Sequence, residues 1–233
     1  MVWRMAQGKI SSPMILVNFK CYLEATGAKA VSLARCAERA AEKFGVVVAV
    51  APQIADLRLV SQQTKIPVFA QHVDPITPGP HTGHVLAESV LEAGASGILV
   101  NHSERTLEPS VIAEVVSRAK SLRLTTVVCA NTPETAAAVA VPSPDMIAIE
   151  PPELIGTGVA VSKAKPEVVT DTVSRIRRFN SEVVILCGAG ITSGEDVKKA
   201  LRLGTQGVLV SSAVVKAKNQ AAAIEELAEA CLQ

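Results

Sequence analysis

The stretch "VVILCGAGITSGEDVKKALRLGTQGVLV", residues 183–210, contains the repeating unit that decides the fold. It begins with an apolar, β-branched run at 183–187, which predicts a buried strand. The segment "TSGEDVKKALRLG" has Ser and acidic residues at its start and Gly204 at its end, as expected of a helix. A second apolar run at 207–210 predicts another strand. Strand, helix and strand in this order indicate a parallel sheet with right-handed crossovers.

The same unit recurs along the chain. Continuously apolar runs, typical of strands covered on both faces, occupy 15–19, 46–50, 67–71, 97–101, 125–129, 145–149, 183–187 and 207–210. The helix candidates between them include 109–122, which begins with Pro109, and 24–44. The latter carries Val31, Leu33, Ala34, Ala37, Ala40 and Ala41 on one broad face and stops at Gly45.

Eight strands alternating with about eight helices predict an α/β fold. At 233 residues, the count of eight favours a single (βα)8 TIM barrel, with a closed eight-stranded parallel sheet, over an open sheet. We expect one domain over residues 1–233, with residues 1–12 as a flexible N-terminal extension.

The composition restricts the class of protein. Hydrophobic residues make up 48% of the chain and aromatic residues 3%, so the core must consist of Ala, Val, Leu and Ile. The net charge of +1, from 23 basic and 22 acidic residues, argues against nucleic acid or an anionic membrane as partner. The sequence has neither a membrane-spanning apolar stretch nor a signal-peptide core, and its five cysteines form no CxxC motif. We therefore expect a cytoplasmic protein.

Polar side chains follow three of the predicted strands. Asn18 and Lys20 stand at the end of the first, His102 and Glu104 follow the fourth, and Glu150 follows the sixth. Each has a structural interpretation of its own: a solvated acid, a capping histidine or a surface lysine. Because the carboxyl ends of the strands in a (βα)8 barrel form one mouth, a lysine, an imidazole and a carboxylate would converge there.

Small residues follow the seventh and eighth strands. They are Gly188, Ala189, Gly190, Ser211 and Ser212, and Gly156 adds a further small residue in the loop after the sixth strand. Small side chains allow backbone N–H groups to approach a ligand closely, and the loops after strands seven and eight of such barrels commonly hold a phosphate. These loops predict a phosphate-binding site.

The loop "EPPELIGTG", residues 150–158, has a restricted backbone at its start and a conformationally permissive one at its end. Pro151 and Pro152 restrict its start, whereas Gly156 and Gly158 permit backbone change at its end. A carboxylate at the hinge of such a loop fits a catalytic base beneath a moving lid, although an ordinary strand-end turn is the simpler reading.

Taken together, "VNFK", "VNHSER" and "EPPELIGTG", with the small loops after strands seven and eight, resemble the triosephosphate isomerase family. The resemblance covers essentially the whole chain in the right order, and the short chain is most similar to the compact archaeal branch. It implies interconversion of dihydroxyacetone phosphate and D-glyceraldehyde 3-phosphate, a step of glycolysis and gluconeogenesis, with no metal or organic cofactor. It also implies a homo-oligomer, either a dimer or a tetramer.

The resemblance further implies roles for individual residues. Glu150 would be the base and His102 a neutral electrophile at the carbonyl oxygen, a pattern for which the family is well known. Lys20 and Asn18 would stabilise the enediolate, with Glu104 supporting Lys20. The remaining implied contacts, to the phosphate and at the lid tip, come from Ile155, Gly156, Gly190, Ser211 and Ser212.

Several positions depart from the family pattern. Glu153 stands where an aromatic residue is usual, and Cys187 and Gly190 stand where a lid-tethering Tyr and a phosphate-binding Ser are usual. Ser211 and Ser212 replace glycines, which either adds hydroxyl donors or restricts the backbone.

Other interpretations of the sequence exist. His72, His81 and His84 could bind a metal, although His81 and His84 follow a Pro-Gly-Pro turn without a clear third ligand at site spacing, and a loop or subunit-contact role is the favoured alternative. Cys129 could be a thiol nucleophile, or a small buried hydrophobe. The chain could also be another phosphosugar-binding barrel enzyme, or a non-catalytic binder of a phosphorylated metabolite on the same scaffold.

Overall fold

The structure is a computed structural model, and it describes residues 13–232. The expected extension at 1–12 lies outside the described residues. The strands are β1 (Met14–Asn18), β2 (Val47–Ala51), β3 (Phe69–Ala70), β4 (Gly97–Val100), β5 (Thr125–Ala130), β6 (Met146–Ile149), β7 (Val184–Cys187) and β8 (Gly207–Val210). The helices of eight or more residues are α1 (Ala28–Phe44), α4 (Pro109–Ser121), α7 (Pro166–Phe179), α8 (Gly194–Arg202) and α10 (Gln220–Ala230).

Shorter helices complete the chain between the strands. They are α2 (Leu57–Gln63), α3 (Ala87–Glu92), α5 (Pro133–Val139), α6 (Val161–Ala164) and α9 (Ser212–Val215), with 3-10 turns at η2 (Leu23–Ala25), η3 (Ile54–Asp56) and η4 (Pro152–Leu154). No helix in the described part of the chain is both long enough and apolar enough to cross a membrane.

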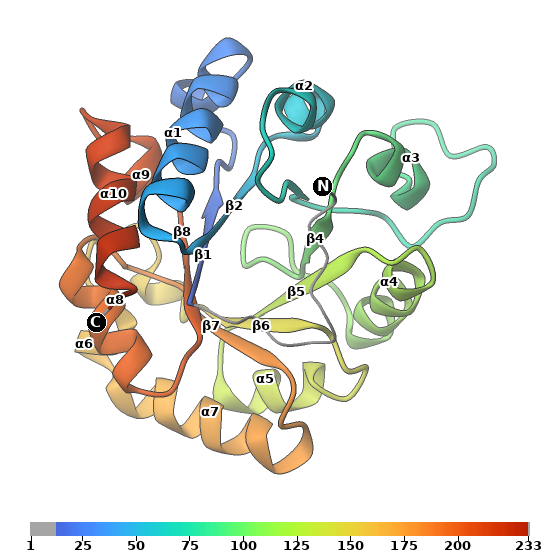
Figure 1. Cartoon of the computed structure of the whole chain (residues 1–233). Helices are drawn as coiled ribbons and strands as arrows, with labels where there is room; N and C mark the ends of the chain where they lie inside the picture. Colours follow the sequence, from blue (N-terminus) through green and yellow to red (C-terminus); the bar gives the residue numbers. More distant parts are fainter. Residues whose placement is uncertain (1–12, 233) are drawn as a thin grey trace.

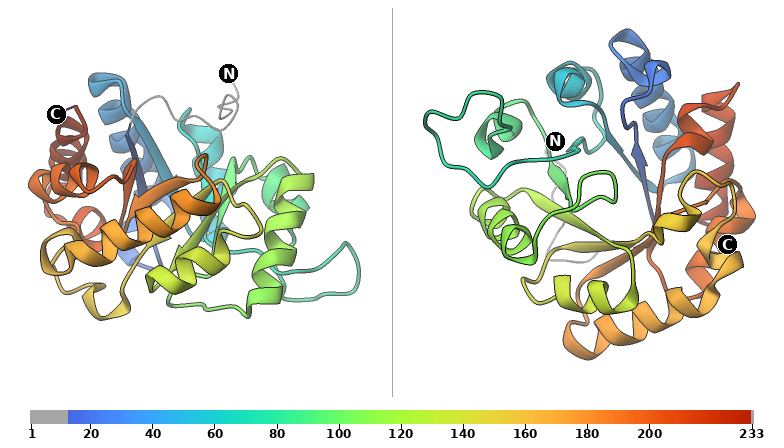
Figure 2. Two further views of the ribbon diagram at one scale, coloured as in Figure 1. Left: turned by 90° about the horizontal axis from the view of Figure 1, so that it is seen from below. Right: turned by 180° about the vertical axis from the view of Figure 1, so that it is seen from behind.

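The eight strands form one parallel sheet that curls into a barrel, with the helices outside it (Figures 1 and 2). The strand order is β2-β1-β8-β7-β6-β5-β4-β3, and an isolated parallel bridge between Val50 and Val68 joins β2 to the segment just before β3. The predicted (βα)8 barrel is therefore confirmed. The segment between β3 and α3 extends away from the barrel (Figure 1).

Alternate strand residues belong to two buried layers, which explains why the strands are continuously apolar. Met14 and Leu16 lie in the cluster inside the barrel, together with Phe69 of β3, whereas Ile15 and Val17 lie in the layer between strands and helices. A strand buried on both faces has no position for a polar side chain until it emerges from the sheet. Apart from cysteine, the polar residues within the strands are Asn18 at the carboxyl end of β1 and Thr125 and Thr126 at the start of β5, where the buried Thr126 hydroxyl donates to Asp145. The site forms at the carboxyl ends of the strands.

The structure corrects two of the predicted boundaries. The first helix begins at Ala28, not at residue 24, because Gly27 adopts a positive φ of 61° and its N–H donates to Asp56 Oδ2 at 2.9 Å. The third strand is Phe69–Ala70, shorter than the predicted 67–71, and proline at position 67 has no N–H to give to a ladder. The other two helices predicted by range agree with α4 and α8 to within two residues.

Candidate active site

The predicted site residues lie together at the carboxyl ends of the strands. They line a single cavity of about 200 Å³ and comprise Asn18, Lys20, His102, Glu104, Glu150, Ile155, Gly156, Gly190, Ser211 and Ser212. These residues come from β1, β4, β6, β7 and β8 or from the loops after them. The barrel is therefore what brings together residues that are up to about 190 positions apart in the chain.

Lys20 is held in a conformation that few non-glycine residues adopt. Its φ is 47°, and its backbone N–H donates to Asn18 Oδ1 at 3.0 Å. The Gln71 amide donates from Nε2 both to the Lys20 carbonyl (3.0 Å) and to the Ala51 carbonyl (2.9 Å). Because left-handed backbone is unfavourable for a lysine, these contacts must hold it, and strain of this kind is concentrated at functional sites.

The Lys20 ammonium group points at a carboxylate on the rim of the cavity. Its Nζ lies 2.8 Å from Glu104 Oε1, and the lysine side chain is 11% exposed whereas that of Glu104 is 58% exposed. Since Asn18 Oδ1 is occupied by the Lys20 N–H, the Asn18 Nδ2 group remains to donate to a ligand. Lys20 and Asn18 thus present an ammonium and an amide donor to the same cavity.

A backbone hydrogen bond at Nδ1 defines the tautomer of the His102 ring. The backbone N–H of Glu104 donates to His102 Nδ1 at 3.2 Å. An imidazolium has no acceptor nitrogen, so this bond selects the neutral ring with its proton on Nε2. His102 Nε2 lies 3.8 Å from Glu150 Oε2, and the site therefore contains a neutral N–H donor next to a carboxylate.

Glu150 is buried and only partly satisfied. The side chain is 7% exposed, and within the described residues Oε2 is a buried oxygen without a hydrogen-bond partner. Its backbone N–H donates to the Ala130 carbonyl at 2.8 Å, which fixes the start of the loop. A buried carboxylate that lines the cavity and keeps an oxygen without a partner has the properties required of a general base.

Gly188 packs directly against the Glu150 side chain. A Cβ atom added at Gly188 would lie 2.3 Å from Glu150 Cγ and 2.8 Å from its Oε1. A side chain at position 188 would therefore displace the carboxylate. The small residue after strand seven, which the sequence suggests only for phosphate binding, also makes space for Glu150.

Gly190 has a structural role in this chain. Its φ is 73°, and an added Cβ would come within 1.9 Å of the Val159 carbonyl oxygen. The backbone of Val159 and Ala160, just after the 150–158 loop, packs directly on Gly190, so the serine usual in the family could not fit there. The departure at position 190 is thus explained by the close approach of this segment.

The loop after β8 offers hydroxyl and amide donors. Ser211 Oγ is a buried oxygen that has no partner in the described part of the protein. Ser212 and Ala213 line the same cavity and stand at the start of α9, where backbone N–H groups have no intrahelical acceptor. An anion in the cavity would satisfy these donors, so the serines add hydroxyl groups to the site.

Gln71 and Tyr22 are among the residues at the site that the sequence did not predict. Gln71 supports Lys20 through the contacts above, and its position at the end of the third predicted strand was the available signal. Tyr22 also lines the cavity, and Lys216 Nζ lies 4.2 Å from the centroid of its ring. Its signal was that Tyr22 is the only tyrosine in the chain and stands two residues after Lys20.

The structure weighs against the thiol alternative. Burial, followed by repulsion from the Glu150 carboxylate, raises the pKa of the Cys129 thiol well above its usual value. The same two causes raise the pKa of Cys187 to about 12. A thiol that stays protonated is a poor nucleophile, and Cys129 packs instead as a small hydrophobe inside the barrel.

The histidines considered for metal binding are placed differently. His72 Nε2 lies 2.9 Å from Asp74 Oδ1, and burial lowers the pKa of His72. The rings of His81 and His84 pack edge to face at 5.8 Å. Among residues 13–232, no three His, Cys, Asp or Glu side chains are grouped so that they could hold a metal ion.

The fold and the cavity define a class: (βα)8-barrel proteins that carry a carboxylate, a neutral imidazole and a lysine at the strand ends, beside loops suited to an anion. Comparison with known proteins narrows the class. The chain belongs to the triosephosphate isomerase family, whose family model matches residues 13–230.

Similar proteins agree over nearly the full length. A triosephosphate isomerase of Methanothermus fervidus is 54% identical over 215 residues, which is 92% of this chain and 97% of that protein. One of Methanocaldococcus jannaschii is 51% identical, covering 92% of this chain and 98% of that protein. These relatives confirm the expected resemblance to the archaeal branch.

A solved structure supports the fold. The crystal structure of triosephosphate isomerase from Bartonella henselae superposes with a TM-score of 0.77, covering 95% of this chain and 100% of that one. At 19% sequence identity, this likeness supports the barrel alone.

Proposed function

We propose that this chain interconverts dihydroxyacetone phosphate and D-glyceraldehyde 3-phosphate through an enediolate. The observation that carries the proposal is the position of Glu150 Oε2, a buried oxygen that has no hydrogen-bond partner among the described residues and lies 3.8 Å from His102 Nε2. His102 Nε2 carries the ring proton because Nδ1 accepts the backbone N–H of Glu104. A base that can return the proton it takes, beside a neutral donor, is what an aldose–ketose isomerisation requires.

The proposed mechanism assigns one step to each group. Glu150 removes a proton from C1 of dihydroxyacetone phosphate and returns it to C2, while the proton of the C1 hydroxyl passes to the C2 oxygen by way of His102 Nε2, so that an aldehyde forms at C1 and a hydroxyl at C2. His102 Nε2–H donates to the carbonyl oxygen as negative charge develops there, and the Lys20 ammonium and the Asn18 amide stabilise the same charge. Glu104 acts by positioning Lys20.

We place the phosphate at the loops after β7 and β8. Ser211 and Ser212 supply hydroxyl and amide donors, and Gly156 and Gly190 bring backbone close to the ligand. Ile155, at the tip of the 150–158 loop, covers the substrate. Exclusion of water by this lid would protect the enediolate from decomposition. A volume of about 200 Å³ suits a small substrate such as a triose phosphate. The proposal requires no metal or organic cofactor.

A coupled assay of triose-phosphate interconversion tests the proposal, with wild type beside Glu150→Asp and His102→Gln. We expect rapid turnover in the wild type and kcat losses of about 10²-fold or more in both variants, because each displaces or removes a group that acts in the transition state. Binding of a phosphate-bearing substrate analogue should survive in both.

The alternative is a barrel that binds a phosphorylated metabolite without converting it. Glu150→Gln separates the two. An isomerase would lose turnover while still binding the analogue, whereas a pure binder would show no wild-type turnover and unchanged affinity. The presence of a buried carboxylate beside a donor favours the enzyme, because a binder of anions has no use for a negative charge in its site.

We also propose that the chain is a single domain, acts in the cytoplasm, and forms a dimer or tetramer. The family match across residues 13–230 supports one domain. Light scattering on the purified protein would distinguish the two assemblies.

A further inference from the structure

We propose that Glu153 and Lys165 form an ionic clasp that holds the 150–158 lid over the cavity. Here the clasp means the ion pair between Lys165 Nζ and Glu153 Oε1. This inference rests on the proposed isomerase activity. It assigns positioning roles, acting through the lid, to two residues that do not line the cavity.

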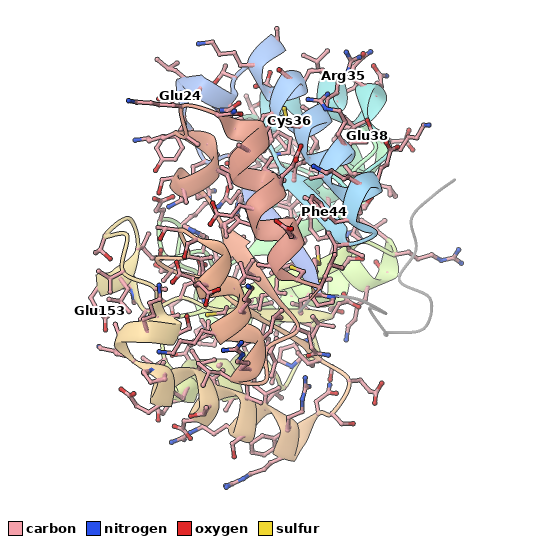
Figure 3. The ribbon with its side chains drawn as sticks, turned by 60° about the vertical axis from the view of Figure 1, so that its left-hand side comes forward. Glu24, Arg35, Cys36, Glu38, Phe44 and Glu153 are labelled. Atoms are coloured by element: carbon pink, nitrogen blue, oxygen red, sulfur yellow. The ribbon has the colours of Figure 1, made fainter. Side chains whose placement is uncertain are left out.

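The two partners belong to parts of the chain that a lid movement would separate. Glu153 is in the 3-10 turn η4, within the lid, and Figure 3 shows it on the outer edge of the molecule, far from α1. Lys165 follows the lid and immediately precedes α7. The ion pair therefore spans the lid from its first half to the helix that follows it.

The Lys165 end is fixed to the barrel. Its backbone N–H donates to the Val161 carbonyl at 2.9 Å, and the Val161 N–H donates to the Ala189 carbonyl in the loop after β7 at 3.3 Å. Lys163 Nζ also lies 2.5 Å from Asp196 Oδ1, a carboxylate that is 1% exposed. The segment that carries Lys165 is thus held against the barrel by these contacts.

The Glu153 end moves with the lid tip. Hydrogen bonds from Leu154 N to the Pro151 carbonyl, and from Ile155 N to the Pro152 carbonyl, make the first half of the lid one unit. The hydroxyl of Thr157 donates to the Leu154 carbonyl at 2.9 Å and so joins the tip to this unit. Ile155 and Gly156 line the cavity in the same arrangement in which the clasp is formed. Opening the lid would therefore carry Glu153 away from Lys165.

The clasp provides a contact at the position where the sequence departs from its family. Glu153 occupies the site of the usual aromatic residue, and β7 ends in Cys187 where a lid-tethering Tyr is usual. An ion pair whose side chains are 53% and 42% exposed contributes little to global stability. A lid with two states of similar free energy is nevertheless sensitive to so small a contribution.

A lid that opens before the reaction is complete changes the products that the reaction forms. An enediolate exposed to water eliminates phosphate: the electron pair at C2 forms a C2–C3 double bond as the C3–O bond breaks, and the released enol tautomerises to 2-oxopropanal. The ratio of 2-oxopropanal formed to isomer formed measures lid closure during turnover. A general loss of stability or of active enzyme would lower both products together and leave this ratio unchanged.

The test measures this ratio and kcat/KM for wild type, Glu153→Gln, Lys165→Gln and the exchanged pair Glu153→Lys with Lys165→Glu. We expect each single variant to raise the ratio about two- to fivefold, the range that one exposed ion pair can contribute, and the exchanged pair to return it toward the wild-type value. In 1 M salt, which screens exposed charges, wild type and Glu153→Gln should converge.

Lys43→Gln is the matched control, because Lys43 forms an ion pair of similar exposure with Glu225 far from the lid. It should leave the ratio unchanged. Unchanged ratios in both single variants, with normal wild-type turnover, would overturn the clasp and leave the isomerase proposal intact. A wild type without turnover would overturn the isomerase proposal itself.

Discussion

At the scale of single residues, the position of Glu150 depends on a glycine that carries no chemistry. The added Cβ at Gly188 would be 2.3 Å from Glu150 Cγ, far closer than carbon atoms can approach. The sequence shows a glycine after a strand. Only the barrel, which places β6 beside β7, shows that the Glu150 carboxylate occupies the space that a side chain at position 188 would fill.

We predict that Gly188→Ala lowers kcat by about 10²-fold, because a shift of about 1 Å in a catalytic group can cost that much. Steady-state kinetics and analogue binding would measure the change. Gly194→Ala is the control, since its added Cβ would meet Ala230 at 3.1 Å, on α10 and away from the cavity. Equal kcat values for Gly188→Ala and wild type would contradict the packing argument.

The cysteines are expected to differ sharply in reactivity. Burial raises the pKa of Cys187 to about 12 and that of Cys231 to about 11, and burial with repulsion from Glu150 raises that of Cys129. A raised thiol pKa means that almost no thiolate exists at pH 8. Cys21, in contrast, is exposed.

Iodoacetamide at pH 8 should therefore label Cys21 in the native protein and leave Cys129, Cys187 and Cys231 unmodified, as mapped by mass spectrometry. All five cysteines should react once the chain is unfolded in denaturant. Labelling of native Cys129 as fast as Cys21 would revive the thiol-nucleophile alternative.

At the scale of elements, the ladder between β7 and β8 is the shortest ladder between neighbouring strands of the sheet. Their ladder contains one residue pair, Cys187 with Val208. Side chains strengthen it: Gln206 Oε1 accepts from the Ile185 N–H at 3.2 Å and from Arg177 Nη2 at 2.5 Å. Arg177, on α7, also donates to the carbonyls of residues 181 and 183.

We predict that Arg177→Met lowers the free energy of unfolding by about 2–3 kcal/mol, because it removes several hydrogen bonds from a charged donor and leaves their acceptors unmatched. Thermal or urea denaturation would measure the loss. Its neighbour Arg178 is exposed, so Arg178→Met should change stability little. Similar stabilities of the two variants would show that the network does not support the β7–β8 contact.

The mispredicted start of the first helix has a long-range physical cause. The first helix starts at Ala28 because Asp56, 29 residues away, binds the Gly27 N–H. Helical propensity over 24–44 contains no information about that contact. Long-range partners decide where an element ends, whereas periodicity decides what kind of element it is.

At the scale of the whole molecule, buried layers inside and outside the sheet connect all eight strands. We expect residues 13–232 to unfold in a single cooperative transition, as one domain does. Fluorescence or circular dichroism during denaturation would measure this transition. A phosphate-bearing substrate analogue at about 100 times its Kd should stabilise the fold by about 2.7 kcal/mol. Two separate transitions, with only one shifted by the analogue, would contradict the single-domain proposal.

The sequence by itself determined the alternation of strands and helices and the presence of polar residues at strand ends. Both follow from local patterns: apolar runs that must be covered on two faces, and side chains that can be polar only where a strand emerges. It also identified Lys20, His102 and Glu150 as a group.

Only the tertiary structure decided how these groups are set for chemistry. The neutral ring of His102 depends on the Glu104 N–H, the backbone of Lys20 depends on the Gln71 amide, and the position of Glu150 depends on the missing side chain at Gly188. Hydrogen-bond direction and close packing act over a few ångströms in space. Apart from the His102–Glu104 bond, they join residues distant in sequence, and no local pattern encodes them.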